Sequence, residues 1–250
     1  MTVQAETAAA VRIEQRFLDG SVFAARYRPA GAPCGTFLAS LPLGEERNNV
    51  IRTVHLLARR LAARGWDAAL FDHPGMGDSA GSGAEMTLAA GIAAGTAVLD
   101  WLAPAGACIV LGVRCGAFAA FEIARQQREC RLILWEPHLS GRRYLRELGL
   151  REHIRGELAG GAAPKPRLNG RPVSAALAAE LEACDIMDRL PASTCLMRIG
   201  GAAGGTAVKA QAGGVETVWV AAPPFWNPHE GWDTMPVVTA TERVVCGDAP

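Results

Sequence analysis

The residues best placed to do chemistry lie in one short turn, LGVRCGA (residues 111–117). Gly112 and Gly116 flank a central residue at the spacing of a nucleophile elbow, a strand-to-helix turn that directs its central side chain into a pocket. The central residue is Arg114, and a guanidinium, which stays protonated, cannot act as a nucleophile. Cys115 is the remaining candidate, because a thiolate attacks acyl groups and a neighbouring cation lowers the pKa of a thiol. Cys115 could instead be a buried packing thiol, since the side chain after the elbow centre normally packs under the following helix.

Arg114 has the chemistry of an anion-binding residue. In an elbow its guanidinium would lie beside a helix N-terminus, where a carboxylate or a phosphate could bind it in a bidentate manner. Glu45 and Glu46, in the loop LPLGEERNN, are the competing internal partners, because an unpaired buried guanidinium is costly. Such a pair could also be functional, with one glutamate as general base and Arg114 stabilising an oxyanion.

The other members of a catalytic triad are harder to find in the sequence. The acid expected after the penultimate strand is missing from IGGAAGGT (residues 199–206). His229, in the loop after the last predicted strand, stands where a catalytic histidine is expected, or it is a solvent-facing loop residue. Glu136, at the end of another strand, could act as the acid for His229 or form a salt bridge to Arg142 or Arg143.

The spacing of apolar residues indicates the elements that must position this turn. Residues 12–19 and 22–27 alternate around Asp19-Gly20 and predict a β-hairpin. Continuous apolar runs predict buried strands at residues 36–41, 67–71, 108–111, 132–135, 194–199 and 215–220. Helical spacing predicts helices at residues 50–64, 87–102 and 117–128, and a closing helix or turn at 236–245. Buried strands alternating with helices indicate an α/β fold with a mostly parallel central sheet and helices on both faces.

A charged insertion over residues 141–189 interrupts this alternation. It begins with the helical sequence RRYLRELGLREHIRGEL, loosens at GGAAPKPRLNGRP and becomes helical again after Ser174, a plausible N-cap. Such an insertion is either a small helical cap over the pocket or a surface excursion. We expect residues 1–250 to form a single domain, because the length suits one large core.

Composition narrows the range of partners. Half of the residues are hydrophobic and the 25 basic and 25 acidic residues cancel, so no overall field favours nucleic acid or an anionic membrane. No stretch is apolar enough for a membrane span, and the N-terminus lacks an export signal. Seven cysteines scattered through apolar strands favour buried small side chains over a disulfide framework, which indicates a cytoplasmic protein.

We expect neither a metal nor a cofactor. The five histidines show no paired spacing on one helix and no CxxC motif occurs. The loop DHPGMGDSAG lacks the third glycine of a dinucleotide fingerprint. Its residues Asp72, Asp78 and Ser79 are predicted to cap the turn and the following helix.

Four short motifs in this order resemble known proteins: Glu-Glu-x-Asn in LPLGEERNN, the arginine-containing turn GVRCGA, NGRPVSAALAAEL, and the Pro-Pro-Phe-Trp of AAPPFWNPHE. Together with the order of elements they resemble the α/β-hydrolase superfamily and, more narrowly, the exosortase A system-associated hydrolase 2 family. The resemblance implies a bacterial cytoplasmic protein linked to exopolysaccharide production and exosortase-type sorting, with a partner in that system.

Two functions remain open. The first is hydrolysis of an ester or thioester, or acyl transfer, by a non-standard set drawn from Arg114, Cys115, His229, Glu45 and Glu46. The second is a catalytically silent hydrolase scaffold that binds an anionic small molecule or a partner protein through Arg114. In either case we expect the ligand to contact Leu43, Gly44, Asn48, Glu136, Phe225 and Trp226.

Overall fold

The fold is built around a central β-sheet. The structure is a computed structural model that describes residues 11–104, 106–127, 130–159, 166–168, 170–200, 208–212, 214–227 and 232–247. Within these residues the sheet has nine strands in the order β1-β2-β4-β3-β5-β6-β9-β11-β10. They are β1 (Arg12–Leu18), β2 (Val22–Arg28), β3 (Gly35–Ser40), β4 (Trp66–Phe71), β5 (Ala107–Val113), β6 (Cys130–Trp135), β9 (Cys195–Ile199), β10 (Val208–Ala212) and β11 (Val215–Val220). The pairs from β4 to β11 are parallel, whereas β1, β2 and β10 join antiparallel at the two edges.

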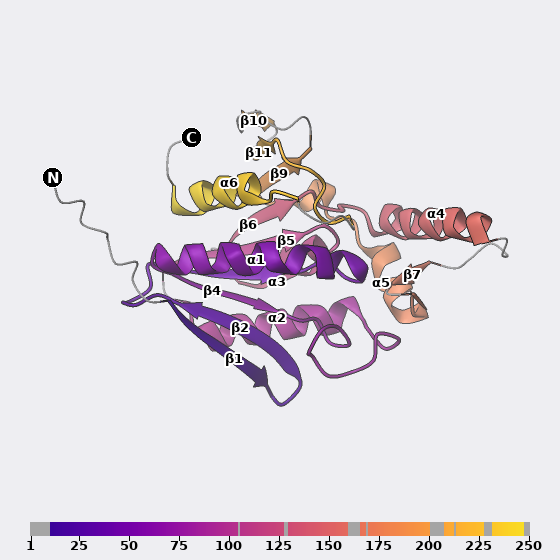
Figure 1. Cartoon of the computed structure of the whole chain (residues 1–250), viewed down its shortest axis with the longest axis horizontal. Coiled ribbons are helices and arrows are strands. Elements are labelled where there is room, and N and C mark those ends of the chain that lie inside the picture. Colours follow the sequence, from indigo (N-terminus) through magenta and orange to yellow (C-terminus); the bar gives the residue numbers. More distant parts are fainter. Residues whose placement is uncertain are drawn as a thin grey trace.

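Helices cover both faces of the sheet (Figure 1). One face is packed by α1 (Glu45–Ala63) and α6 (Met235–Cys246), and the other by α2 (Leu88–Leu102) and α3 (Gly116–Gln126). The predicted α/β architecture, including the N-terminal hairpin β1–β2, is therefore confirmed.

The segment over residues 141–189 forms its own group of elements at the carboxyl end of the sheet. It contains α4 (Gly141–Ala159), the short strands β7 (Arg167–Leu168) and β8 (Arg171–Pro172), α5 (Ala175–Ala183) and a 3-10 turn at Met187–Arg189. Ser174 caps α5 as predicted, because its hydroxyl accepts a hydrogen bond from the Leu177 N–H at 3.0 Å. Leu168 lies against Gly44, so this segment reaches the loop after β3.

One predicted helix start was wrong, and one edge strand of the central sheet was missed. The helix expected from residue 50 begins at Glu45, so Glu45 and Glu46 lie in its first turn and not in a loop. The helical spacing of apolar residues does not extend to this turn, because the turn faces a cavity. Its two acidic side chains are favoured there, since they lie at a helix N-terminus. Strand β10 was missed, because it pairs only with β11 at the sheet edge and its sequence is rich in alanine.

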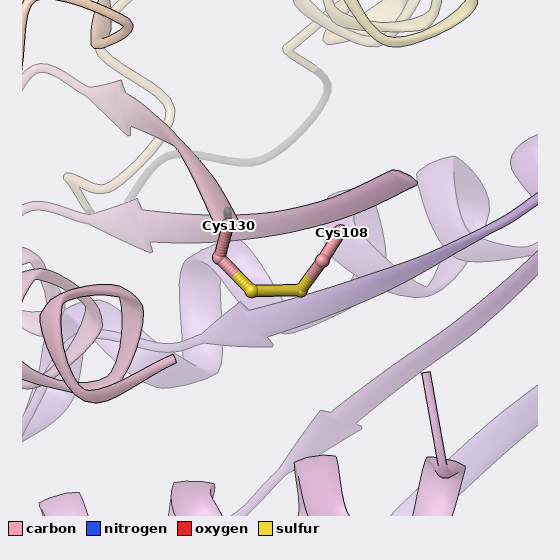
Figure 2. Close-up of a disulfide and its surroundings, with 2 residues drawn as sticks. All are labelled: Cys108 and Cys130. Carbon is pink, nitrogen blue, oxygen red and sulfur yellow. A yellow bond between two sulfur atoms is a disulfide. The ribbon is translucent and has the colours of Figure 1, made fainter. Parts of the chain in front are cut away.

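The expectation that the cysteines are buried small side chains and not members of a disulfide framework was wrong for one pair. Cys108 and Cys130 form a disulfide with a Cα–Cα distance of 4.5 Å, and Figure 2 shows it bridging β5 and β6. The two residues face each other in the register of these parallel strands. Because the pairing depends on strand register, their separation of 22 residues along the chain did not reveal it. Five other cysteines are free thiols.

Candidate functional site

The turn between β5 and α3 has the backbone of a nucleophile elbow. Arg114 has a φ of +52°, in the left-handed region that side chains other than glycine rarely adopt. A Cβ on Gly116 would lie 2.5 Å from the carbonyl oxygens of Ser40 and Leu41, and one on Gly112 would lie 2.7 Å from Ala117. Both flanking residues must therefore be glycine, because α3 packs directly onto the sheet at this point.

The Arg114 side chain is enclosed by other protein groups. Its Nε donates to Oε2 of Glu46 at 3.3 Å, and one terminal nitrogen donates to the Glu136 carbonyl at 3.0 Å. The guanidinium carbon lies 4.8 Å from the ring centre of Trp226, a cation–π contact. Arg114 is only 8% exposed. The nucleophile's place is thus filled by an internal ion pair.

Helix α4 completes a network of alternating charges around this pair. Both terminal nitrogens of Arg151 donate to Oε1 of Glu46 at 3.1 Å, and one also contacts Glu147 at 2.5 Å. Glu147 in turn lies 3.7 Å from the Arg114 guanidinium. Although burial lowers it, the pKa of Arg151 is raised overall by Glu46 and Glu147. The ion pairs therefore tie α1, the elbow and α4 together.

Cys115 lies under the turn, and its thiol is held by two neighbours. The Leu43 N–H donates to its sulfur at 3.1 Å, and its side chain hydrogen-bonds with that of Tyr144. Cys115 is 1% exposed, and burial, with a smaller contribution from the Glu46 charge, raises the pKa of its thiol to about 11. A thiol in this environment stays protonated at neutral pH, despite the neighbouring Arg114.

His138 is a second buried group beside the elbow. Its backbone N–H donates to the Arg114 carbonyl at 3.2 Å, and its ring centre lies 4.6 Å from that of Tyr144. Its Nδ1 is 3.7 Å from Glu147, whereas its Nε2 has no hydrogen-bond partner among the described residues. Burial, helped by the charges of Arg114 and Arg151, lowers the pKa of His138 to about 3. The imidazole is therefore neutral at physiological pH.

A cavity of about 390 Å³ opens above this network, between the start of α1 and α4. It is lined by Leu43, Glu45, Glu46, Asn48, Asn49, Tyr144, Leu148, Arg151, Glu152, Arg167, Leu168, Trp226 and Asn227. Glu46 and Trp226 separate Arg114 from the cavity, because both contact its guanidinium and both line the wall. A ligand in the cavity would thus meet the glutamate and the tryptophan before the arginine.

The predicted site residues fall into three groups. Leu43, Glu45, Asn48 and Trp226 line the cavity together with Glu46. Gly44 (φ +72°), Glu136 and Phe225 do not line it. His229 lies outside the described residues.

Two of these side chains have structural contacts elsewhere. The Glu136 carboxylate accepts hydrogen bonds from Arg198 at 3.1 Å and from the Ile199 N–H at 2.8 Å, and the predicted partners Arg142 and Arg143 were wrong. Phe225 packs edge-on against Trp135 in the core, with ring centres 5.9 Å apart. Glu136 therefore joins β6 to β9, and Phe225 supports Trp226 from behind.

Sequence reasoning missed the contribution of α4. Tyr144, Leu148 and Glu152 repeat every four residues on its buried face, and Glu147 and Arg151 repeat at the same spacing beside them. This spacing indicates an ion-paired helix face, but it does not predict which residues of α1 and the elbow the helix contacts.

The loop DHPGMGDSAG has a structural role. Asp72 pairs with Arg47 at 2.5 Å and accepts from the Asp78 N–H, while Ser79 donates to the Asp72 carbonyl and accepts from Phe23 N–H. Among the described residues, no cluster of three or more His, Cys, Asp or Glu side chains is placed to hold a metal ion. None of the helices that the structure describes is long and apolar enough to cross a membrane.

Comparisons with known proteins place this geometry in context. Neither a family profile nor a curated protein matches the chain. Among solved structures, that of DcsB with its substrate analogue aligns at a TM-score of 0.60 over 96% of this chain and 100% of DcsB, with 11% identity. The α/β hydrolase domain-containing protein 10 from mouse aligns at 0.56 over 95% and 100%, with 14% identity. This chain has the α/β-hydrolase fold.

A third neighbour is a serine-to-alanine variant of the N-formylmaleamic acid deformylase Nfo from Pseudomonas putida S16. It aligns at a TM-score of 0.52 over 92% of this chain and 100% of that protein, with 18% identity. At such identities the likeness establishes the fold, whereas the chemistry must come from the site itself.

Proposed function

We propose that this α/β-hydrolase-fold protein binds a small anionic ligand and does not hydrolyse esters. The observation that carries the proposal is the Arg114–Glu46 ion pair at the elbow, with Nε 3.3 Å from Oε2. An arginine in this place supplies no nucleophile, and its pairing with Glu46 leaves no room for one. The neighbouring thiol is buried and protonated, so it does not take over the role.

Arg167 is the charged group on the cavity wall that suits an anion. Glu46 is neutralised by Arg114 and Arg151, and Glu45 and Glu152 have interactions of their own. In the part of the chain that the structure describes, Arg167 on the cavity wall contacts only the Gly170 carbonyl, at 3.3 Å. Its guanidinium is exposed and has no acidic partner among the described residues, which suits a carboxylate or a phosphate.

The proposal includes the link to exopolysaccharide production. Three of the four motifs that suggested this link lie at or next to the cavity. LPLGEERNN supplies cavity-lining residues, GVRCGA lies beneath Glu46, and the Pro-Pro-Phe-Trp motif brings Trp226 to the wall. A sugar that carries a carboxylate, such as a uronic acid, is a component suited to a polysaccharide and could also pair with the Arg167 guanidinium. Glucuronate is therefore the first probe, with glucose as its uncharged counterpart.

Calorimetric titration tests the binding. We expect glucuronate to bind the wild-type protein and glucose to bind at least about tenfold more weakly, because only glucuronate pairs with Arg167. Arg167→Gln should lose about tenfold in glucuronate affinity. Arg171→Gln is the matched control, since Arg171 is exposed on the adjacent strand β8 and does not line the cavity. Equal affinities for the two sugars, or equal losses in the two variants, would reject an anionic ligand at Arg167.

Ester hydrolysis tests the second half of the proposal. With p-nitrophenyl acetate and butyrate, we expect the wild-type rate to equal the buffer rate. Turnover that disappears in Arg114→Ala or Cys115→Ala would contradict the proposal and assign the activity to the elbow.

A further inference from the structure

We infer that the outer face of α4 is a docking surface for an anionic lipid bilayer. The surface, here called the α4 outer face, consists of Arg142, Arg143, Arg146, Leu150 and Ile154. All five side chains are exposed, and Leu150 and Ile154 are exposed by 59% and 51%. They share one side of the helix, opposite Tyr144, Leu148 and Glu152, which face the protein. Figure 1 shows α4 at one end of the molecule, away from the β1–β2 hairpin.

Two of the three arginines lie where a helix disfavours a positive charge. Arg142 and Arg143 lie in the first turn of α4, which contains no acidic residue, and Arg146 lies one turn further on. Cations at a helix N-terminus are destabilising, because the positive end of the helix dipole lies there. No residue that the structure describes forms an ion pair or a hydrogen bond with any of the three guanidiniums. In the described part of the chain no group neutralises these three charges, which are therefore available to an external anion.

The chemistry of this surface favours a bilayer over an acidic protein segment. A hollow of about 830 Å³ is lined by the three arginines and also by Glu182 and Asp185. These carboxylates would repel an acidic segment bound in the hollow, whereas a flat lipid surface touches only the outer side of α4. Leu150 and Ile154 follow the arginines one and two turns along the same side. At a bilayer surface the guanidiniums can pair with lipid phosphates, while the exposed aliphatic side chains can contact the acyl chains below them.

The α4 outer face and the cavity lie on opposite sides of the helix, so a bilayer could bind whether or not the cavity holds a ligand. The cavity is lined by the opposite side of α4, through Tyr144, Leu148 and Arg151. A membrane-bound molecule would keep that side against α1 and the elbow.

Co-sedimentation of the full chain with vesicles tests the inference. The vesicles contain phosphatidylcholine with about 30% phosphatidylglycerol, or phosphatidylcholine alone, at about 50 mM and about 300 mM salt. We expect binding to the anionic vesicles at low salt, weaker binding at high salt, and none to phosphatidylcholine alone. The triple variant Arg142→Gln, Arg143→Gln, Arg146→Gln should lose on the order of 100-fold in partitioning, since each charge near an anionic surface contributes several-fold.

The matched control removes three arginines elsewhere, in the variant Arg28→Gln, Arg52→Gln, Arg59→Gln. These side chains are exposed on β2 and α1, so the net charge changes equally while the α4 outer face stays intact. We expect this control to bind within about threefold of the wild type. Leu150→Ser with Ile154→Ser should weaken binding while keeping its salt dependence. Circular dichroism checks that each variant is folded.

Three outcomes would overturn the inference. One is no sedimentation with anionic vesicles at low salt, and another is an equal loss in the control. The third is binding of poly-glutamate without binding of vesicles, which would assign the surface to an acidic protein instead.

Discussion

The Leu43 N–H donates a hydrogen bond to the sulfur of Cys115 at 3.1 Å. In α/β hydrolases a backbone N–H from this loop helps to hold the oxyanion, together with the N–H of the residue after the nucleophile. Here the loop donor is already used by a protonated thiol. Two parts of the elbow are therefore engaged internally, the central side chain by Glu46 and the loop donor by Cys115.

The burial of Cys115 predicts a thiol that reacts slowly in the folded protein. Because its pKa is raised to about 11, we expect alkylation by iodoacetamide at about pH 8 to be on the order of 100-fold slower than at the exposed thiol of Cys34, or slower still. Peptide mass spectrometry after timed quenching measures both rates. In urea the two cysteines should react alike. Comparable rates in the folded state would show an accessible, activated thiol at the elbow.

The Arg114–Glu46 pair predicts a large cost when one partner is removed. Both side chains are about nine-tenths buried. Arg114→Met leaves Glu46 with Arg151 as its remaining partner, and Glu46→Gln leaves the two guanidiniums to share Glu147, which is 39% exposed. We expect each change to lower the free energy of unfolding by about 3–5 kcal/mol, measured by urea denaturation. The double variant should cost at least about 1 kcal/mol less than the sum of the two, because the groups interact directly.

The control for this cycle is Arg125→Met. Arg125 pairs with Glu122 on α3, and its side chain is 56% exposed. Its removal should cost no more than about 1 kcal/mol, as is usual for exposed ion pairs. Equal losses for Arg114→Met and Arg125→Met would mean that the elbow pair contributes no more than a surface contact.

Sequence patterns predicted the fold well because the signals for it are local. Apolar runs marked the buried strands, the Asp19-Gly20 turn marked the hairpin, and two glycines around Arg114 marked the elbow. The charge network was less predictable, because its members come from α1, the elbow and α4 and meet only through packing. Glu46 was one of two candidates for Arg114, and only the start of α1 decides that Glu46 turns inward while Glu45 faces solvent. The disulfide was unpredictable for the same reason, since it depends on the register of β5 against β6.

His138 predicts a loss of stability in mild acid. Its pKa is about 3 in the folded protein and near 6.5 in the unfolded chain, so the unfolded state binds a proton first as the pH falls. The stabilising contribution is present above about pH 6.5 and is lost as the pH falls toward 3. Urea denaturation at about pH 7, 5.5 and 4.5 measures how the free energy of unfolding falls with pH. His138→Gln should flatten the dependence, although not fully, because the buried His73 also has a lowered pKa of about 4. An unchanged profile would show that His138 is accessible to protons in the folded state.

The Cys108–Cys130 disulfide predicts that the stability of the protein depends on reductant. The bridge closes a loop with a sequence separation of 22 residues, and restricting the unfolded chain over that length stabilises the fold by about 3 kcal/mol. We expect dithiothreitol, or Cys108→Ser with Cys130→Ser, to lower the free energy of unfolding by that amount. Cys34→Ser is the control and should change it by less than about 0.5 kcal/mol, because Cys34 is an exposed free thiol. Peptide mapping without reductant should recover the cross-linked pair from the purified protein. If both cysteines are alkylated there and reductant leaves stability unchanged, the two strands pair without a covalent bridge.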